Sequence, residues 1–287
     1  MPVSVVTDST ASMPAEEIAA FDLDVVSLWV NDGDSHVPDT DIDLHEFFAR
    51  LSNTAALPTS SQPSVEAMVE AFTRAIERGS DVVGVFISEQ MSGTIQAARL
   101  AAQMVAEQFP AARIELVDGR SNCMQEGYAV LAAARAAKAG ESIERCVQAA
   151  IETTKRTRFL FSPASLEYLR RGGRIAAASA LLGQLLQVRP ILTVEEGEVT
   201  TFAKVRTTSR ALAEMGRKFA DDVKEFGLAN VIVHNIGDPA PAIAFAHEFV
   251  EPVTGGPVRV VPTSAVIGVH VGPAVGLVYE TQGDLRP

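Results

Sequence analysis

Apolar residues in the first half of the chain fall into short continuous runs, each followed by a polar turn and then by a helical pattern. The run VSVV, within an expected strand at residues 2–7, is followed by Asp8, Ser9 and Thr10 and then by an expected helix at residues 13–21. Uninterrupted apolar runs of this length are typical of strands that are buried on both faces. Such strands alternating with helices indicate a mostly parallel sheet with flanking helices.

The same order recurs between residues 81 and 109. A second apolar strand is expected at residues 82–87, and the turn SEQMSGT separates it from a helix. The apolar face of that helix comprises Ala97, Ala101, Met104 and Val105. A further strand is expected at residues 114–117, and another helix is expected to begin near Val65.

The pattern changes after about residue 155. A short strand at residues 159–161 precedes expected helices near residues 164–169 and 177–187, and two strands around the turn Glu-Glu-Gly-Glu then predict an antiparallel hairpin. The remaining expected elements are helices at 208–226 and 240–249 and strands at 230–234, 258–261 and 275–279. We therefore expect two α/β domains, at residues 1–156 and 157–287, the second with a mixed sheet, and a ligand site in the cleft between them.

Composition places the chain among ordinary globular proteins. Its 287 residues suffice for two domains, and 47% of them are hydrophobic and 21% charged. No apolar run approaches the roughly 18 residues that cross a membrane, and no basic region followed by an apolar one marks the N-terminus. We therefore expect a cytoplasmic protein without a transmembrane segment, for which a transient membrane contact stays open. The net charge of −12 argues against nucleic acid as a partner.

Several motifs that would suggest a metal or cofactor are incomplete. Asp39, Asp41 and Asp43 alternate as in a calcium loop, but Leu44 stands where that loop requires glycine. Two His-Glu pairs lack the second histidine of the zinc motif HExxH, and there is no Walker A sequence or GxGxxG after the first strand. The two cysteines do not form a CxxC pair, and we expect reduced thiols that pack as small apolar residues. We therefore expect no metal and no cofactor.

Polar turns at the ends of the expected strands are candidate binding sites. In open α/β sheets ligands bind beyond the carboxyl ends of the strands, which is where residues 8–10, 58–64 and 88–94 fall. Hydroxyl groups and free amide groups at a helix start attract an anion. The same serines and threonines, among them Ser92 and Thr94, could instead only cap the helices that follow.

A histidine between glycines and a basic cluster add further candidates. His270 lies in the run IGVHVGPAVG, where Gly268 and Gly272 permit positive φ and the close approach of a ligand or another segment. On this local sequence alone, a structural histidine beside tight strand connections is the favoured interpretation. The basic cluster LRRGGRI suits a phosphate or an acidic partner, or forms a solvated turn. Its charged members are Arg170, Arg171 and Arg174.

Together these motifs resemble the DegV family, bacterial proteins whose characterised members, the FakB type, bind a fatty acid. The matching segments are TDSTAS at 7–12, SSQPS at 60–64, ISEQMSGTIQAA at 87–98, YLRRGGRI at 168–175, RPIL at 189–192, KVRT at 204–207 and the His270 run. The resemblance implies a two-domain α/β fold with an acyl chain in an apolar tunnel and its carboxyl group hydrogen-bonded between the domains.

The resemblance also implies the residues that hold the carboxyl group. Ser92 and His270 match two head-group ligands of the family, and Ser60 stands where the family usually has threonine. Serine keeps the hydroxyl group and lacks the methyl group, so Ser60 can serve the same purpose. The neighbouring Thr59 and Gly93 complete the implied set.

The resemblance further implies a partner, a fatty acid kinase that uses ATP to phosphorylate the bound acid to an acyl phosphate for phospholipid synthesis. The binding protein is then not the catalyst. The candidates for docking the kinase are Arg170, Arg171, Arg174 and Arg206. A different interpretation is a serine esterase or thioesterase in which His270 deprotonates Ser92, although the chain has no GxSxG elbow. A third is a sensor or scaffold that retains lipid without serving a kinase.

Overall fold

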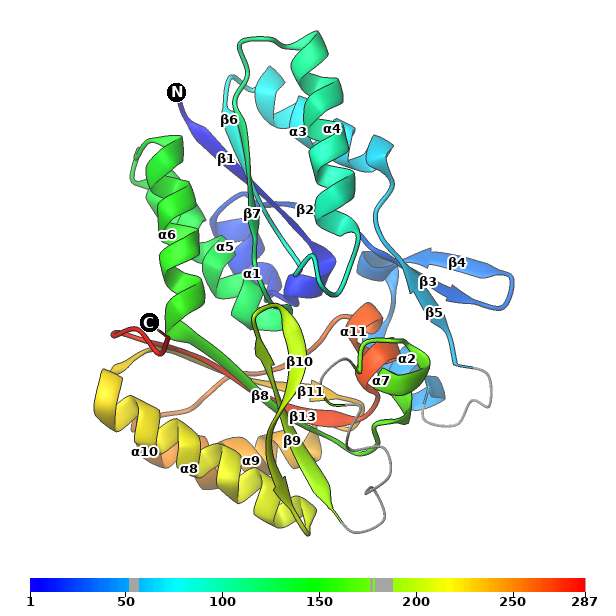
Figure 1. The fold of residues 1–287 in the computed structure, drawn as a ribbon, viewed down its shortest axis with the longest axis vertical. Coiled ribbons are helices and arrows are strands. Elements are labelled where there is room, and N and C mark those ends of the chain that lie inside the picture. The colour runs from blue at the N-terminus through cyan, green and yellow to red at the C-terminus, as the bar shows by residue number, and fades with distance from the viewer. Residues whose placement is uncertain (52–56, 176–177, 179–187, 287) are drawn as a thin grey trace.

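The strands in the described part of the chain form three sheets, which Figure 1 shows with the elements labelled. The computed structural model describes residues 1–51, 57–175, 178 and 188–286. A four-stranded sheet occupies the upper half of the view and a six-stranded sheet the lower half, while a small three-stranded sheet lies at the right (Figure 1). The N-terminal strand belongs to the first sheet and the last strand to the second.

The four-stranded sheet is parallel and is covered by helices on both faces. Its strands, in spatial order, are β2 (Asp24–Val26), β1 (Val3–Asp8), β6 (Asp81–Phe86) and β7 (Ile114–Asp118). Neighbouring residues of β1 face opposite sides, because side chains alternate along a strand. Val6 packs with α3 (Val65–Glu77) and α4 (Thr94–Gln108), whereas Val5 packs with α5 (Cys123–Lys138) and α6 (Ile143–Arg156). The predicted parallel sheet with flanking helices is confirmed.

The six-stranded sheet is mixed, as the pattern after residue 155 predicts. Its order is β10 (Glu198–Val205), β9 (Arg189–Glu195), β8 (Thr157–Pro163), β13 (Ala274–Thr281), β11 (Leu228–Ile236) and β12 (Val260–Pro262). Only β11 and β12 pair in parallel, and β9 and β10 form the expected antiparallel hairpin. The helices α8 (Thr208–Phe226) and α9 (Ala240–Phe245) cover one face, and α8 has the predicted bounds. A π-helical turn at Ala246–Val250 and α10 (Glu251–Thr254) continue from α9.

Several expected boundaries are wrong in detail. The strand expected at residues 159–161 is the seven-residue β8, and the helix expected at residues 164–169 is the shorter and later α7 (Glu167–Arg171). Met104 does not belong to the buried face of α4, because its side chain is 41% exposed while Ala97, Ala101 and Val105 are buried. The helix expected near residues 177–187 lies outside the described residues.

The three-stranded sheet brings an early part of the chain beside a late one. It consists of β4 (Ser35–Pro38), β3 (Trp29–Asp32) and β5 (Thr59–Ser61), all antiparallel. Helix α11 (Ala265–Val271) packs on β3 and β5, and α2 (Leu44–Leu51) packs on α11 and pairs its Arg50 with Asp32 of β3. A shared apolar cluster also joins Phe48 and Tyr128 to Phe161 and Val278 of the second sheet. The division of the chain at residue 156 stays a prediction, although β8 begins the second sheet at that point.

Within the part of the chain that the structure describes, no helix is both long and apolar enough to span a bilayer. No group of three or more histidine, cysteine or acidic side chains in that part is arranged to hold a metal ion.

Candidate functional site

The segment around His270 is helical. It forms α11, which begins after Ser264 and ends at Gly272, where φ is 67°. The serine caps the helix, since its Oγ accepts a hydrogen bond of 3.3 Å from the amide of Ile267. The expectation of positive φ is therefore correct for Gly272 and wrong for Gly268, which lies within the helix. Gly268 is needed for a different reason, because a Cβ atom there would overlap the ring of Phe48.

His270 is hydrogen-bonded to Ser60. The Oγ atom of Ser60 lies 2.7 Å from Nε2 of His270, although the two residues are 210 positions apart in the chain. Ser60 is on β5, where it pairs with Val30 of β3, so a short antiparallel sheet fixes its position next to α11. The structure thus brings together two of the three residues predicted to hold a carboxyl group.

Ser92, the third of these residues, lies in the turn between β6 and α4. Its Oγ is 2.8 Å from Oγ1 of Thr94, and it also accepts a hydrogen bond of 3.3 Å from the Thr94 amide. The adjacent Gly93 is the cap residue of α4, and a Cβ atom on it would overlap the side chain of Gln62. The SSQPS and SEQMSGT motifs therefore pack on each other, and Gly93 is the point of close approach.

One narrow cavity joins Ser60, Ser92 and His270. Its volume is about 50 Å³, and its walls come from both sides of residue 156. The apolar walls are Leu28, Ile87, Met91, Phe159, Phe161, Leu169, Val199, Val266, Ile267 and Val271. The polar residues are Ser60, Ser92, Asn122, Arg174 and His270. Such a lining, apolar with a few polar groups, is typical of sites for small organic ligands.

A second cavity adjoins the Ser60–His270 pair. It has a volume of about 260 Å³ and includes Thr59, which is exposed, together with Tyr168, Arg171 and Gly172. Ser60, Arg174 and His270 line both cavities. These three side chains therefore stand between an inner apolar space and an outer space with basic residues.

The imidazole of His270 is neutral at physiological pH. Burial is the main cause that lowers its pKa to about 4, and the positive charge of Arg174 lowers it further. A neutral imidazole carries one N–H donor and one acceptor. Since Nε2 is bonded to Ser60 and no described residue bonds Nδ1, His270 can act in this site as a hydrogen-bonding group and is a weak base.

The predicted docking arginines occupy different places. Arg170 and Arg171 are exposed and pair with Glu167 at 2.6 and 2.8 Å. Arg174 is held beside the site, because its guanidinium donates to the carbonyl groups of Met91 and Gly172.

Arg206 does not join the other three arginines. It is exposed and follows β10, whose last residue, Val205, pairs with Arg189. The opposite end of the hairpin contacts the turn after β6, where the hydroxyl of Ser88 donates to the carbonyl of Gly197. Arg206 therefore lies at the end of the hairpin remote from that contact, and it lines neither cavity beside His270.

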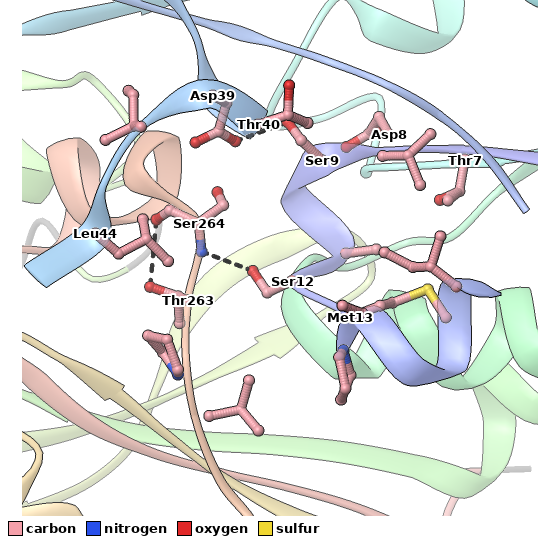
Figure 2. A pocket seen from close by; sticks show the side chains of 18 of the residues that line it. Thr7, Asp8, Ser9, Ser12, Met13, Asp39, Thr40, Leu44, Thr263 and Ser264 are labelled. Carbon is pink, nitrogen blue, oxygen red and sulfur yellow. Dashed lines mark hydrogen bonds between the residues drawn. The ribbon is translucent and has the colours of Figure 1, made fainter. Parts of the chain in front are cut away.

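The TDSTAS motif holds the start of α11. Ser12 Oγ accepts a hydrogen bond of 3.0 Å from the amide of Ser264, as Figure 2 shows. Asp39, rejected above as a calcium ligand, accepts from the Val266 amide at 3.1 Å and from the Ser9 hydroxyl at 2.7 Å. A carboxylate at a helix N-terminus is favourable, because it meets free N–H groups and the positive end of the helix dipole. Burial nevertheless raises the pKa of Asp39.

These anchoring residues surround a separate, larger cavity of about 500 Å³ (Figure 2). Asp8 also lines this cavity; its Oδ2 accepts from the Ile87 amide at 2.9 Å and its Oδ1 from the amide of Thr10 at 2.9 Å. Burial raises the pKa of Asp8 to about 6. The sequence marks these residues as a polar turn, but it gives no signal that their partners are the first residues of α11.

Comparison with known proteins shows that the whole chain is similar to the members of one protein family. A family model described as uncharacterised proteins of the DegV family matches residues 2–282. A DegV domain-containing protein of Clostridium acetobutylicum is 40% identical over 287 residues, which cover 100% of both chains. One from Streptomyces coelicolor is 35% identical over 276 residues, covering 95% of this chain and 96% of the relative.

Solved structures of fatty acid-binding proteins have the same fold as this chain. A fatty acid-binding DegV family protein from Thermus thermophilus has a TM-score of 0.88 and 32% identity, covering 98% of this chain and 100% of that one. A stearic acid-binding protein from Eubacterium ventriosum has a TM-score of 0.88 and 26% identity, with 98% of each chain covered. DegV of Bacillus subtilis, a fatty acid-binding protein, has a TM-score of 0.87 and 28% identity, covering 98% of this chain and 99% of that one.

Proposed function

Because the chain belongs to the DegV family, we propose that it binds a long-chain fatty acid and holds the carboxyl group among Ser60, Ser92 and His270. The observation that carries this proposal is the Ser60–His270 hydrogen bond of 2.7 Å at one cavity with Ser92 and apolar walls. The fatty acids bound by the Thermus thermophilus and Eubacterium ventriosum proteins support the same class of ligand.

The acyl chain supplies most of the affinity in this proposal. Burying one methylene group is worth about 0.8 kcal/mol, so a chain of roughly fourteen contributes on the order of 10 kcal/mol before the costs of binding. The volume of the cavity, about 50 Å³, is too small for such a chain, so the cavity walls must move apart when the acyl chain binds. Met91 is suited to this movement, because an unbranched thioether side chain adapts its shape at low cost.

The head group supplies orientation. A buried carboxyl group without hydrogen bonds would be costly, and two hydroxyl groups and one imidazole nitrogen remove that cost. The neutral His270 donates from one nitrogen, while Ser60 and Ser92 donate through rotatable hydroxyl groups. Binding therefore replaces the direct Ser60–His270 contact by contacts to the ligand.

We further propose that the bound acid is presented to a fatty acid kinase for phosphorylation to an acyl phosphate. The placement of Ser60, Arg174 and His270 between the inner and the outer cavity supports this step, because a carboxyl group held there faces the outer opening. Arg171 lines that opening and Arg170 is next to it in α7. Basic side chains at the opening suit an acidic partner surface or a transferred phosphate group.

The hydrolase interpretation has less support from the geometry. The Ser92 hydroxyl is bonded to Thr94, and the hydroxyl group that contacts His270 belongs to Ser60. Among the described residues no acidic group bonds Nδ1 of His270, and a pKa of about 4 makes the imidazole a poor general base at neutral pH. A binding role fits these contacts better than nucleophilic catalysis.

Denaturing mass spectrometry of lipid extracted from the purified protein tests the proposal. We expect a fatty acid at about one per chain, and much less from His270→Ala prepared in parallel. Protein that is empty and also refuses added fatty acid would contradict the proposal. Release of product from acyl esters that is lost in Ser92→Ala would favour the hydrolase instead.

A further inference from the structure

Asn122 places an unsatisfied carbonyl group in the wall of the inner cavity. It precedes α5 and lines the same cavity as Ser92 and His270. Its side chain does not cap the helix, although asparagine at that position usually accepts a hydrogen bond from the first turn. The residue is only 8% exposed, and no donor in the described part of the chain reaches its Oδ1 atom.

The orientation of the Asn122 amide follows from its other contact. Nδ2 donates to the sulfur of Met91 at 3.2 Å. Sulfur is a weak acceptor and does not donate, so the NH₂ group belongs on the Met91 side and the carbonyl oxygen on the other. A buried acceptor without a partner costs about 1–3 kcal/mol, so one that lines a ligand cavity calls for an explanation.

We propose that the Asn122 carbonyl accepts a hydrogen bond from an O–H group of the bound ligand. This inference rests on the proposed fatty acid binding. None of the donor side chains that line the same cavity, Ser60, Ser92, Arg174 and His270, bonds the Asn122 carbonyl, and the sulfur of Met91 beside it cannot donate. In this proposal the donor therefore enters with the ligand. A fatty acid carries an O–H group when its carboxyl group is protonated, or when its chain bears a hydroxyl group.

Asn122 would then discriminate between ligands by their chemistry. A ligand that brings an O–H group to this place gains a hydrogen bond and removes the cost of the unpaired carbonyl. A ligand that puts only methylene groups against Asn122 leaves that cost in the complex, because methylene groups cannot donate. In this proposal Ser60, Ser92 and His270 recognise the carboxyl group of the ligand. Asn122 favours ligands that carry an O–H donor.

The test compares wild type with Asn122→Leu, which has a similar shape and no polar atom. Dissociation constants are measured for palmitic acid and for palmitic acids hydroxylated at successive chain positions, each below and above neutral pH. We expect affinity for the ligand that supplies the O–H group to fall about 3- to 10-fold in the variant, which corresponds to one neutral hydrogen bond. The melting temperature of the ligand-free variant should be unchanged or higher, because an unpaired buried acceptor has been removed.

The arms of the experiment identify the source of the O–H group. A loss for palmitic acid that shrinks as the pH rises indicates the protonated carboxyl group. A loss confined to one hydroxylated acid, at every pH, indicates a chain hydroxyl group. Equal affinities of wild type and Asn122→Leu for all of these acids would overturn the inference, and would show that solvent satisfies the carbonyl. Wild type that binds none of them would instead overturn the proposed function.

Thr193→Val is the matched control. Thr193 is also buried and its Oγ1 also has no partner among the described residues, but it does not line the cavity. The control should leave every dissociation constant unchanged. If Asn122→Leu is not folded by circular dichroism, Asn122→Ala replaces it, and the ratio of affinities for hydroxylated and plain acids remains the readout.

Discussion

The imidazole of His270 lies directly against the backbone of Gly172, so closely that a methyl group at Gly172 would overlap Nδ1. Gly172 ends α7 with ordinary right-handed dihedral angles, so alanine would not strain the backbone there. Gly172, the first glycine of the LRRGGRI motif, is therefore required because its missing side chain leaves room for the His270 ring. The basic cluster and the histidine are in contact at this glycine.

Gly172→Ala should displace His270 without unfolding the protein. The added methyl group pushes the ring away from Ser60, and we expect fatty acid affinity to fall about 10-fold or more, as for loss of a hydrogen bond to a charged or polar head group. Displacement of a fluorescent fatty acid measures this. Gly256→Ala is the control, since nothing lies within 4 Å of a Cβ atom at that position. Equal losses in both variants would contradict the steric explanation.

Removing Ser60, Ser92 or His270 should weaken binding through the head group. Each substitution by alanine should lower fatty acid affinity about 10- to 150-fold, because a hydrogen bond to a charged group is worth about 1.5–3 kcal/mol. Titration calorimetry with palmitic acid provides the measurement. Ser61→Ala, on the same strand as Ser60 but lining neither cavity, should bind normally. Unchanged affinity in both Ser92→Ala and His270→Ala would remove the basis for the assigned site.

Asp39→Ala should affect stability and binding together. It leaves the Ser9 hydroxyl and the Val266 amide without their acceptor, and we expect the free energy of unfolding to fall by about 1–3 kcal/mol. Fatty acid affinity should also fall, because His270 is on the helix that Asp39 anchors. Urea denaturation and ligand titration measure the two effects. Asp41 is an exposed neighbour, and Asp41→Ala should change neither stability nor affinity. If Asp39→Ala lowers stability but not affinity, Asp39 does not support the binding site.

The ionisation of Asp8 should make stability depend on pH. Because burial raises its pKa from 3.8 to about 6, the folded protein keeps the Asp8 proton through a range where the unfolded chain has lost it. Asp8 therefore favours the folded state most below about pH 4, and this contribution is lost as the pH rises through about 6. His234 and His270 act in the opposite sense, since their lowered pKa values of about 4 make the folded state less stable as the pH falls below 6.5.

A difference between variants separates the histidines from Asp8 and its buried neighbour Glu126, whose pKa is raised by burial and by the charge of Asp8. In urea denaturation, the stability of Asp8→Asn relative to wild type should increase by about 2 kcal/mol between about pH 4.5 and about pH 7.5. The amide cannot replace every hydrogen bond of the carboxyl group, but that cost does not vary with pH. A relative stability that is flat across this range would show that Asp8 has an ordinary pKa.

Charge reversal should separate docking from lipid binding. Arg170→Glu places an acidic group at the outer opening, and we expect it to lower kinase-dependent formation of acyl phosphate about 10-fold while palmitic acid binds normally. Arg206→Glu should have a smaller effect, because Arg206 follows the remote end of β10. Purified fatty acid kinase with ATP provides the assay. Normal turnover in both variants would contradict docking at these arginines.

The elements that could be predicted from sequence are those with a local cause. β1 and β6 are uninterrupted apolar runs between polar turns, and α8 has a threonine cap at Thr207 followed by a regular amphipathic pattern. The helix α11 escaped prediction because its β-branched and glycine-rich sequence favours a strand. It is helical because distant residues, Asp39 and Ser12, hold its start and Phe48 packs on Gly268.

The residues of the candidate site could be predicted from the sequence, but the contacts between them could not. A resemblance identified Ser60, Ser92 and His270, but no local pattern shows that Ser60 contacts His270 while Ser92 contacts Thr94. The role of Ser12 was equally hidden, since its partner is 252 residues away. Asn122 carried no signal at all, because an unpaired carbonyl is a property of its surroundings and not of its sequence.

The 210 residues between Ser60 and His270 also set the order in which the site can arise during synthesis. A ribosome has produced Ser60, Ser92 and both anchors of α11 long before it reaches the histidine, and β13, which joins β8 to β11, comes later still. A partly translated chain therefore exposes apolar cavity walls without the group that completes the head-group site. The proposed head-group site is therefore completed only after most of the cavity wall has been translated.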